Sequence, residues 1–193
     1  MTAGKDAAGE PGRKLVLVRH AKSAWPDVPD HERPLARRGL RDAPAMGRWL
    51  RRAGCVPDLV WCSTARRAEQ TWQLAAAELP ASPPARPDDR IYQASAAGLL
   101  DLIRLAGPAA MTVLVVGHEP AVRELALMLA APAAEAGQAG SGGGPAPSGP
   151  LARMTAKFPT AAVAVLEFTG TWPLLGPGQA RLDQFVIPRD LPS

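Results

Sequence analysis

Short apolar runs that alternate with helical patterns constrain the fold of this 193-residue chain more than any other feature. Residues 15–18 and 111–116 consist mainly of Leu and Val, which is typical of strands covered on both faces. A third run covers residues 58–62. Strands separated by helices predict an α/β fold: a three-layer sandwich with a mostly parallel central sheet and helices on both faces. Helical patterns cover residues 35–53, 66–79, 96–106 and 120–130, and further strands are expected at 161–168 and 181–187.

The pattern over residues 35–53 is an amphipathic helix that is rich in arginine. Pro44 interrupts it and either kinks the helix or marks its true start. Its core candidates are Leu40, Met46, Trp49 and Leu50. Its arginines favour a solvated helix face, with a docking patch for an acidic partner as the alternative. They are Arg37, Arg38, Arg41, Arg48, Arg51 and Arg52.

The length fits a single domain over residues 14–193, preceded by a flexible tail at residues 1–13. Residues 131–150 are rich in Gly, Pro and Ala, contain almost nothing that could pack, and predict a flexible loop that interrupts this domain. The formal charge of +4 and pI near 9.6 suit anionic partners without singling out nucleic acid.

Cysteine usage and hydropathy predict a cytoplasmic protein. The two cysteines, Cys55 and Cys62, form no CxxC pair, so neither a disulfide framework nor a zinc site is expected. The N-terminal residues lack the apolar run of a signal peptide. No stretch reaches the ~20 apolar residues that cross a membrane, so no membrane association is expected.

Polar side chains follow three of the predicted strands. Arg19 and His20 come after the first strand, Arg67 lies just beyond the second, and His118 and Glu119 follow the third. The carboxyl ends of parallel strands meet at one edge of a sheet, which is where α/β folds place groups that handle anions. We therefore expect these side chains to form one site.

Several common kinds of phosphate chemistry do not fit the spacing of the residues. A cysteine phosphatase needs Cys-x5-Arg, but the sixth residue after Cys62 is Ala68 and the sixth after Cys55 is Trp61. The chain also lacks a G-x4-G-K-[ST] phosphate loop and a G-x-G-x-x-G fingerprint. Nucleotide-driven and dinucleotide chemistry are therefore not expected.

The motifs R-H-A-K-S, S-T-A-R-R-A-E-Q-T and V-G-H-E-P resemble, in order and context, those of the histidine phosphatase superfamily. They are most similar to its small SixA-type branch, the phosphohistidine phosphatases. D-H-E-R-P-L-A-R-R-G and F-P-T-A-A-V-A-V-L-E-F extend the resemblance over residues 14–188. Two departures stand out: Ala21 replaces the usual glycine, and Pro26 stands near the place of the asparagine found in mutases.

The resemblance implies a phosphoglycerate mutase-like fold and a pocket of two arginines and two histidines. It makes His20 the nucleophile that is phosphorylated during turnover, with Arg19, Arg67 and His118 around it. Physical chemistry supports the assignment, because phosphoryl transfer depends mainly on positioning and charge neutralisation. Guanidinium forks suit phosphate oxygens, and their positive field keeps the imidazole of His20 neutral in the empty site. No metal and no other cofactor are expected.

The proton donor is left open by the sequence. Glu119 is the first candidate, because related acid phosphatases carry an acidic residue there, but it could instead interact with the start of the following helix. Asp88, Asp89 and Tyr92 are the alternatives, or no acid at all for a phosphohistidine substrate.

Residues close after the nucleophile could touch the substrate. Lys22 and Ser23 are the substrate-binding candidates. His31 and Arg33 could line the mouth of the pocket, although a structural role in the loop is favoured.

The predicted function is a phosphatase with a covalent phosphohistidine intermediate, acting on phosphohistidine in proteins. Little chain is inserted between the motifs to build a lid, which favours a protein substrate. A phosphatase for a small phosphate ester is the alternative, followed by a phosphate-binding adaptor without turnover. Nucleic-acid binding is not expected, since no binding motif accompanies the arginines.

Overall fold

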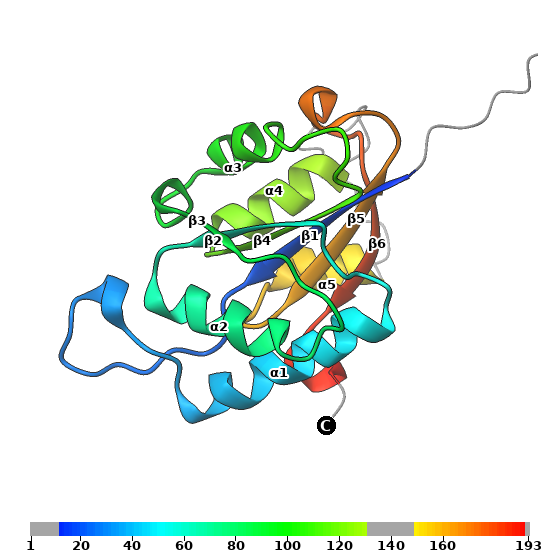
Figure 1. Cartoon of the computed structure of the whole chain (residues 1–193). Helices are drawn as coiled ribbons and strands as arrows, with labels where there is room; N and C mark the ends of the chain where they lie inside the picture. Colours follow the sequence, from blue (N-terminus) through cyan, green and yellow to red (C-terminus); the bar gives the residue numbers. More distant parts are fainter. Residues whose placement is uncertain (1–11, 131–148, 192–193) are drawn as a thin grey trace, which may run out of the picture.

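One six-stranded sheet forms the centre of the molecule, as described for residues 12–130 and 149–191 by a computed structural model (Figure 1). Its strands are β1 (Arg13–Arg19), β2 (Leu59–Ser63), β3 (Arg86–Asp88), β4 (Thr112–Gly117), β5 (Val163–Phe168) and β6 (Arg181–Val186). They lie in the order β3-β2-β4-β1-β5-β6. β5 pairs antiparallel with both of its neighbours, and the other neighbouring pairs are parallel. Of these six strands, β5 alone therefore runs in the opposite direction.

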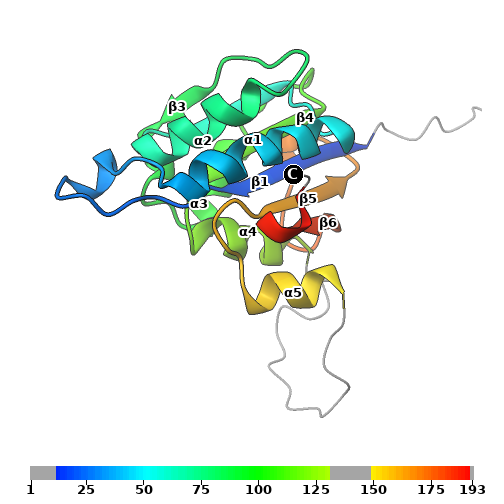
Figure 2. The same ribbon diagram turned by 90° about the horizontal axis from the view of Figure 1, so that it is seen from below.

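Helices cover both faces of the sheet (Figures 1 and 2). They are α1 (Arg37–Arg52), α2 (Arg66–Ala76), α3 (Ala96–Ile103), α4 (Ala121–Ala130) and α5 (Pro150–Ala156). Short 3-10 turns are η1 (Asp30–Glu32), η2 (Asp89–Ile91), η3 (Trp172–Leu174) and η4 (Pro188–Asp190). α1 and α2 pack on one face, and α3, α4 and α5 on the other. In the described part of the chain, none of these helices has the length and apolarity to cross a membrane. The predicted three-layer α/β sandwich is confirmed.

The side chains of β1 divide between two apolar cores, one on each face of the sheet. Val16 and Val18 pack with α1 and α2, whereas Leu15 and Leu17 pack with α3 and α4. All four are fully buried. Since successive side chains of a strand point to opposite faces, a continuous apolar run is what a doubly covered strand requires. Burial of each such side chain contributes about 1.5–3 kcal/mol to folding.

Strand register brings the ends of β1, β2 and β4 to one level. Arg19, the last residue of β1, pairs with Gly117, the last residue of β4. Cys62, the next-to-last residue of β2, pairs with Val116 of β4. The residues that follow these three parallel strands therefore emerge at the same edge of the sheet.

The observed α1 corrects one core prediction. Met46 and Leu50 are buried as expected, but Leu40 is 48% exposed. The buried face of the helix follows Gly39, Met46 and Leu50, so Leu40 is rotated by about 100° away from it. Pro44 lies inside the helix and does not mark its start.

Two elements were not predicted. β3 is a three-residue edge strand without an apolar run. α5 begins at Pro150, within the range expected to be a flexible loop. The remainder of that range, residues 131–148, lies outside the described residues, as do residues 1–11 of the expected tail. Arg13, the last residue of that tail, instead opens β1, and its buried guanidinium donates to the carbonyls of Gly170 and Ala110, each at 2.7 Å.

Candidate active site

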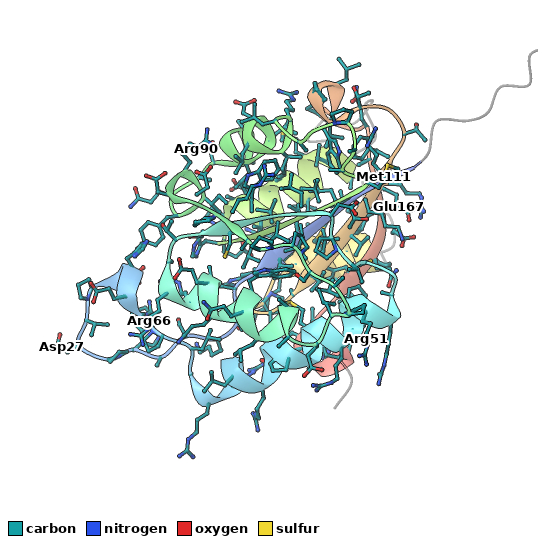
Figure 3. All side chains as sticks on the ribbon, in the orientation of Figure 1. Asp27, Arg51, Arg66, Arg90, Met111 and Glu167 are labelled. Carbon is teal, nitrogen blue, oxygen red and sulfur yellow. The ribbon has the colours of Figure 1, made fainter. Side chains whose placement is uncertain are left out.

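The structure brings Arg19, His20, Arg67 and His118 together at the carboxyl edge of the parallel strands. The rings of His20 and His118 lie 5.0 Å apart between centroids. Arg67, the second residue of α2, places its Nε 3.3 Å from Nε2 of His20. Figure 3 labels Asp27 and Arg66 at this end of the molecule and Glu167 at the opposite end of the sheet.

A backbone contact fixes which nitrogen of His20 carries the proton. Nδ1 lies 2.8 Å from the carbonyl oxygen of Ala21. Because a carbonyl can only accept a hydrogen bond, Nδ1 must be the protonated nitrogen. Nε2 of the neutral ring then keeps its lone pair, and it accepts the hydrogen bond from Nε of Arg67. The atom that faces the guanidinium is thus the one able to act as a nucleophile.

Burial keeps the imidazole of His20 neutral. The pKa of His20 is lowered to about 4, mainly by burial and also by the positive charges of Arg67, Arg19 and Arg33, against the opposing hydrogen bond to Ala21. At neutral pH nearly every molecule therefore holds His20 in its unprotonated form.

His118 is neutral for the same reason. Burial, then the neighbouring His20 and Arg67, lower the pKa of His118 to about 3. Its Nε2 lies 2.8 Å from the hydroxyl oxygen of Ser63, the last residue of β2, and this contact fixes the orientation of the ring. Ser63 was not among the predicted site residues, although its place at the end of a strand beside β4 could have indicated a role.

Asp30 of η1 holds the guanidinium of Arg67. Nη1 of Arg67 donates to the carbonyl oxygen of Asp30 at 2.6 Å, and Nη2 donates to its carboxylate at 3.0 Å. The hydroxyl of Tyr92 donates to the same carboxylate oxygen at 2.6 Å. Hydrogen bonds from Tyr92 and Arg33 hold the pKa of Asp30 well below its usual range. Asp30 was missed, since only the D-H-E-R-P-L motif pointed to it.

Arg33 ties the loop between β1 and α1 together. Its guanidinium donates to the Asp30 carboxylate at 2.6 Å, to the Ser23 hydroxyl at 2.7 Å and to the Ala24 carbonyl at 2.9 Å. These contacts fit the structural role expected for Arg33. The hydroxyl of Ser23 is thus held within the loop, and the side chain of Lys22 is exposed. Contact of either residue with the substrate stays a prediction.

Arg19 is anchored from the segment that precedes β5. Its Nη1 donates to the carbonyl oxygen of Phe158 at 2.7 Å. Its Nε is buried and has no hydrogen-bond partner in the described structure. Burial lowers the pKa of Arg19, while the nearby Glu119 raises it. An unsatisfied, charged donor of this kind is suited to receive an anion.

Glu119 lies at the border of the site. Oε2 of Glu119 is 3.5 Å from Nε of Arg123, one turn along α4. Burial raises the pKa of Glu119 against the opposing charges of Arg123 and Arg19. A raised pKa is favourable for a group that must carry a proton.

Tyr92 lies closest to the site among the alternative proton donors. Its ring is 5.5 Å from that of His118 and 4.9 Å from that of His31. The hydrogen bond to Asp30 raises the pKa of Tyr92, so its hydroxyl stays protonated. Asp88 turns away, because its carboxylate binds the backbone and guanidinium of Arg90. The backbone carbonyl of Asp89 accepts a hydrogen bond from the amide of Tyr92, and within the described residues its carboxylate forms no ion pair.

The arrangement can hold one tetrahedral anion. Arg67 and the ring of His118 both lie next to His20, whose Nε2 keeps its lone pair, and Arg19 is near enough for its charge to lower the pKa of His20. Within residues 12–130 and 149–191, no group of three His, Cys, Asp or Glu side chains gathers as ligands of a metal ion would. Forked donors and a buried neutral imidazole are suited to phosphoryl transfer by an enzyme nucleophile.

Comparisons with known proteins show to which family the chain is similar. Residues 15–95 match the model of the histidine phosphatase superfamily (branch 1). An uncharacterized protein of Mycobacterium tuberculosis is 43% identical over 173 residues, which cover 89% of this chain and 100% of the relative. The structure of a candidate phosphohistidine phosphatase SixA from Nakamurella multipartitia is 32% identical, with a TM-score of 0.78, over 93% of this chain and 98% of that one.

A more distant structure bears on the fold alone. The phosphoglycerate mutase of Plasmodium falciparum is 15% identical with a TM-score of 0.56, and the match covers 91% of each chain. The fold is therefore phosphoglycerate mutase-like, as the resemblance implied. The chain belongs to the histidine phosphatase superfamily. This membership, together with its phosphatase neighbours, supports a phosphatase enzyme.

Proposed function

We propose that this protein removes the phosphoryl group from phosphohistidine in proteins, with His20 as the nucleophile. The observation that carries the proposal is the state of His20: a buried, neutral imidazole whose unprotonated Nε2 faces the guanidinium of Arg67. A cytoplasmic location, where its phosphoprotein substrates would be found, is part of the same proposal.

In the first step, Nε2 of His20 attacks the phosphorus atom of the substrate. A P–N bond forms to His20 while the bond between phosphorus and the substrate's own nitrogen breaks. Arg19 and Arg67 neutralise the equatorial oxygens of the transferring group, and His118 donates to an oxygen once the anion has drawn a proton onto its ring. The leaving group takes the electron pair of the broken bond.

The leaving imidazole must receive a proton. Glu119, whose burial raises its pKa, is the proposed donor, and Tyr92 is the alternative that lies within the site. In the second step a water molecule attacks the phosphorus atom, its proton passes to the group that gave one up in the first step, and inorganic phosphate leaves. The bonding pair returns to Nε2 of His20, which restores the starting tautomer.

The first experiment offers a phosphohistidine protein, a phosphoserine peptide and a small phosphate ester to the wild type and to His20→Ala. We expect turnover of the phosphohistidine protein by the wild type and none by the variant. Turnover that survives in His20→Ala removes His20 from its role. Preference for the small ester selects a metabolite phosphatase, and an inert wild type that still binds phosphate selects the adaptor.

Two neighbouring arginines supply a matched control. Arg67 is buried at the site, whereas Arg66 is exposed one residue earlier in the same helix. Arg67→Ala is expected to lower kcat by about 10²-fold or more, as for the loss of a donor to transition-state charge, and Arg66→Ala to change it little.

For the proton donor, the pH–rate profile of Glu119→Gln is compared with that of Tyr92→Phe. The variant that loses its basic limb identifies the acid.

A further inference from the structure

A basic groove lies beside the candidate active site and has no part in the chemistry described above. It has a volume of about 400 Å³ and lies between the first turn of α1, the end of α5 and the segment after β6. Four cationic side chains line it, and apolar side chains complete its wall. The cationic residues are Arg38, Arg153, Lys157 and Arg189, of which Arg153 forms an ion pair with Asp190.

Strand register places this groove at the same edge of the sheet as the site. Val163, where β5 begins, pairs both with Val18 near the end of β1 and with Val186 at the end of β6. The chain before β5 and the chain after β6 therefore both lie at the carboxyl end of β1. Lys157 and Arg189 belong to these two segments.

Two backbone contacts connect the groove to the site. The carbonyl oxygen of Phe158, the residue directly after Lys157, accepts a hydrogen bond from the guanidinium of Arg19 at 2.7 Å. On the other side, Gly39 of α1 follows Arg38 and packs so tightly that an added Cβ would lie 2.3 Å from the carbonyl oxygen of Lys22. The groove and the phosphoryl site thus share neighbouring residues on both sides.

The charge of the groove is only partly neutralised within the protein. Arg38 pairs with Asp42 at 3.2 Å, and Arg189 is 3.9 Å from Asp190 and 78% exposed. Asp190 is shared, because it also binds Arg153. Among the described residues, no carboxylate lies within ion-pair distance of Lys157, which leaves its charge available.

The position of Arg38 is unfavourable for helix stability. It lies in the first turn of α1, which contains no acidic residue and lacks a side-chain cap. The positive end of the helix dipole disfavours a cation there. Arg51 and Arg52, in the last turn of the same helix, lie where the dipole favours them. Helix stability therefore explains the presence of Arg51 and Arg52 at the far end of α1, but it does not explain the presence of Arg38.

The walls of the groove indicate the chemistry of its partner. Phe185, Ile187 and Pro188 supply apolar surface between the cations. A volume of about 400 Å³ exceeds what a single phosphate needs and suits a few side chains of a peptide. A peptide with an apolar side chain flanked by carboxylates would pack against the apolar wall and form ion pairs with the cations.

We infer that this groove docks an acidic segment of the phosphoprotein whose phosphohistidine enters the neighbouring site. The inference rests on the proposed function and names the class of protein substrate. It adds a second contact, made by the substrate at a distance from the scissile bond. Such a contact lowers KM for the protein and leaves the turnover of small esters unchanged.

The experiment uses two synthetic phosphohistidine peptides that differ only in flanking residues, acidic in one and neutral in the other. The wild type is expected to show a KM roughly tenfold lower for the acidic peptide at low salt, with the difference shrinking as salt screens the charges. In the triple variant Arg38→Gln/Lys157→Gln/Arg189→Gln, the acidic peptide should lose this advantage. Activity on a small phosphate ester should not change.

The control variant is Arg51→Gln/Arg52→Gln, at the other end of α1 (Figure 3). Arg51 lies thirteen positions after Arg38 in the helix, a distance of about 20 Å along its axis. The control should keep the preference for the acidic peptide. Equal KM values for the two peptides in the wild type, or an unchanged preference in the triple variant, would overturn the inference.

Binding of the unphosphorylated peptides, followed by fluorescence anisotropy, separates docking from catalysis. If phosphohistidine turnover fails but the acidic peptide binds the wild type and not the triple variant, the docking role of the groove is supported and the proposed function is refuted. If turnover occurs without any preference for acidic flanks, the proposed function is supported and the docking role is refuted.

Discussion

The two buried histidines should make the fold sensitive to acid. In the folded chain the pKa of His20 is about 4 and that of His118 about 3, whereas an unfolded histidine titrates near 6.5. Between these values the unfolded chain binds protons that the folded chain does not. The stability that depends on these two neutral histidines is therefore fully present above pH 7 and is lost as the pH falls toward 4.

The size of the effect follows from the populations of the protonated forms. At pH 5 nearly every unfolded histidine is protonated, while in the folded chain His20 and His118 remain mostly neutral. Each group then costs about 2 kcal/mol of folding free energy relative to pH 8, so the pair costs about 4 kcal/mol. Typical domains have only about 5–15 kcal/mol in total.

Urea unfolding at pH 8 and pH 5 measures this loss. The reference is His20→Asn/His118→Gln, in which neither position titrates, while the amide nitrogens can still reach the carbonyl of Ala21 and the hydroxyl of Ser63. Carboxylates elsewhere affect both proteins equally and cancel. The wild type should lose about 4 kcal/mol more than the variant between the two pH values. Parallel losses in the two proteins would falsify the assignment of neutral, buried histidines.

Three further perturbations test other contacts. Ser63→Ala removes the hydroxyl that orients His118 and should lower kcat about tenfold with little change in thermal stability; unchanged kcat in steady-state assays would contradict this role. Asp30→Asn removes a negative charge from Arg67 and should tighten orthovanadate binding about fivefold, measured by inhibition, whereas weaker binding would show that Asp30 mainly orients the guanidinium. Gly47→Ala would place a Cβ 2.2 Å from a carbonyl oxygen of α2 and should destabilise the fold by about 1–3 kcal/mol in urea, and full stability would refute the close packing of α1 on α2.

The sheet and the convergence of four side chains could be predicted because both depend on local patterns. Apolar runs mark the central strands, and parallel strands bring their carboxyl ends to one edge. This topology directly predicts the common location of four side chains, those of Arg19, His20, Arg67 and His118. Their catalytic roles remain part of the proposal.

The residues that were missed act over long sequence distances. Asp30 reaches Arg67, 37 residues away, through a loop whose path no periodicity reveals. Ser63 is separated from His118 by 55 residues and meets it only through the pairing of β2 with β4. β3 was missed because an exposed edge strand needs no apolar run. Leu40 was misassigned because a single rotation of 100° decides which side of a helix it occupies.

The contact between Nδ1 of His20 and the carbonyl oxygen of Ala21 bears on how this enzyme could change during evolution. A carbonyl belongs to the peptide unit and survives the exchange of any side chain. Ala21 therefore leaves the proton on the same ring nitrogen as a glycine would, and its methyl group is fully buried. Substitution at this position can alter packing while the proposed nucleophile keeps its reactive tautomer.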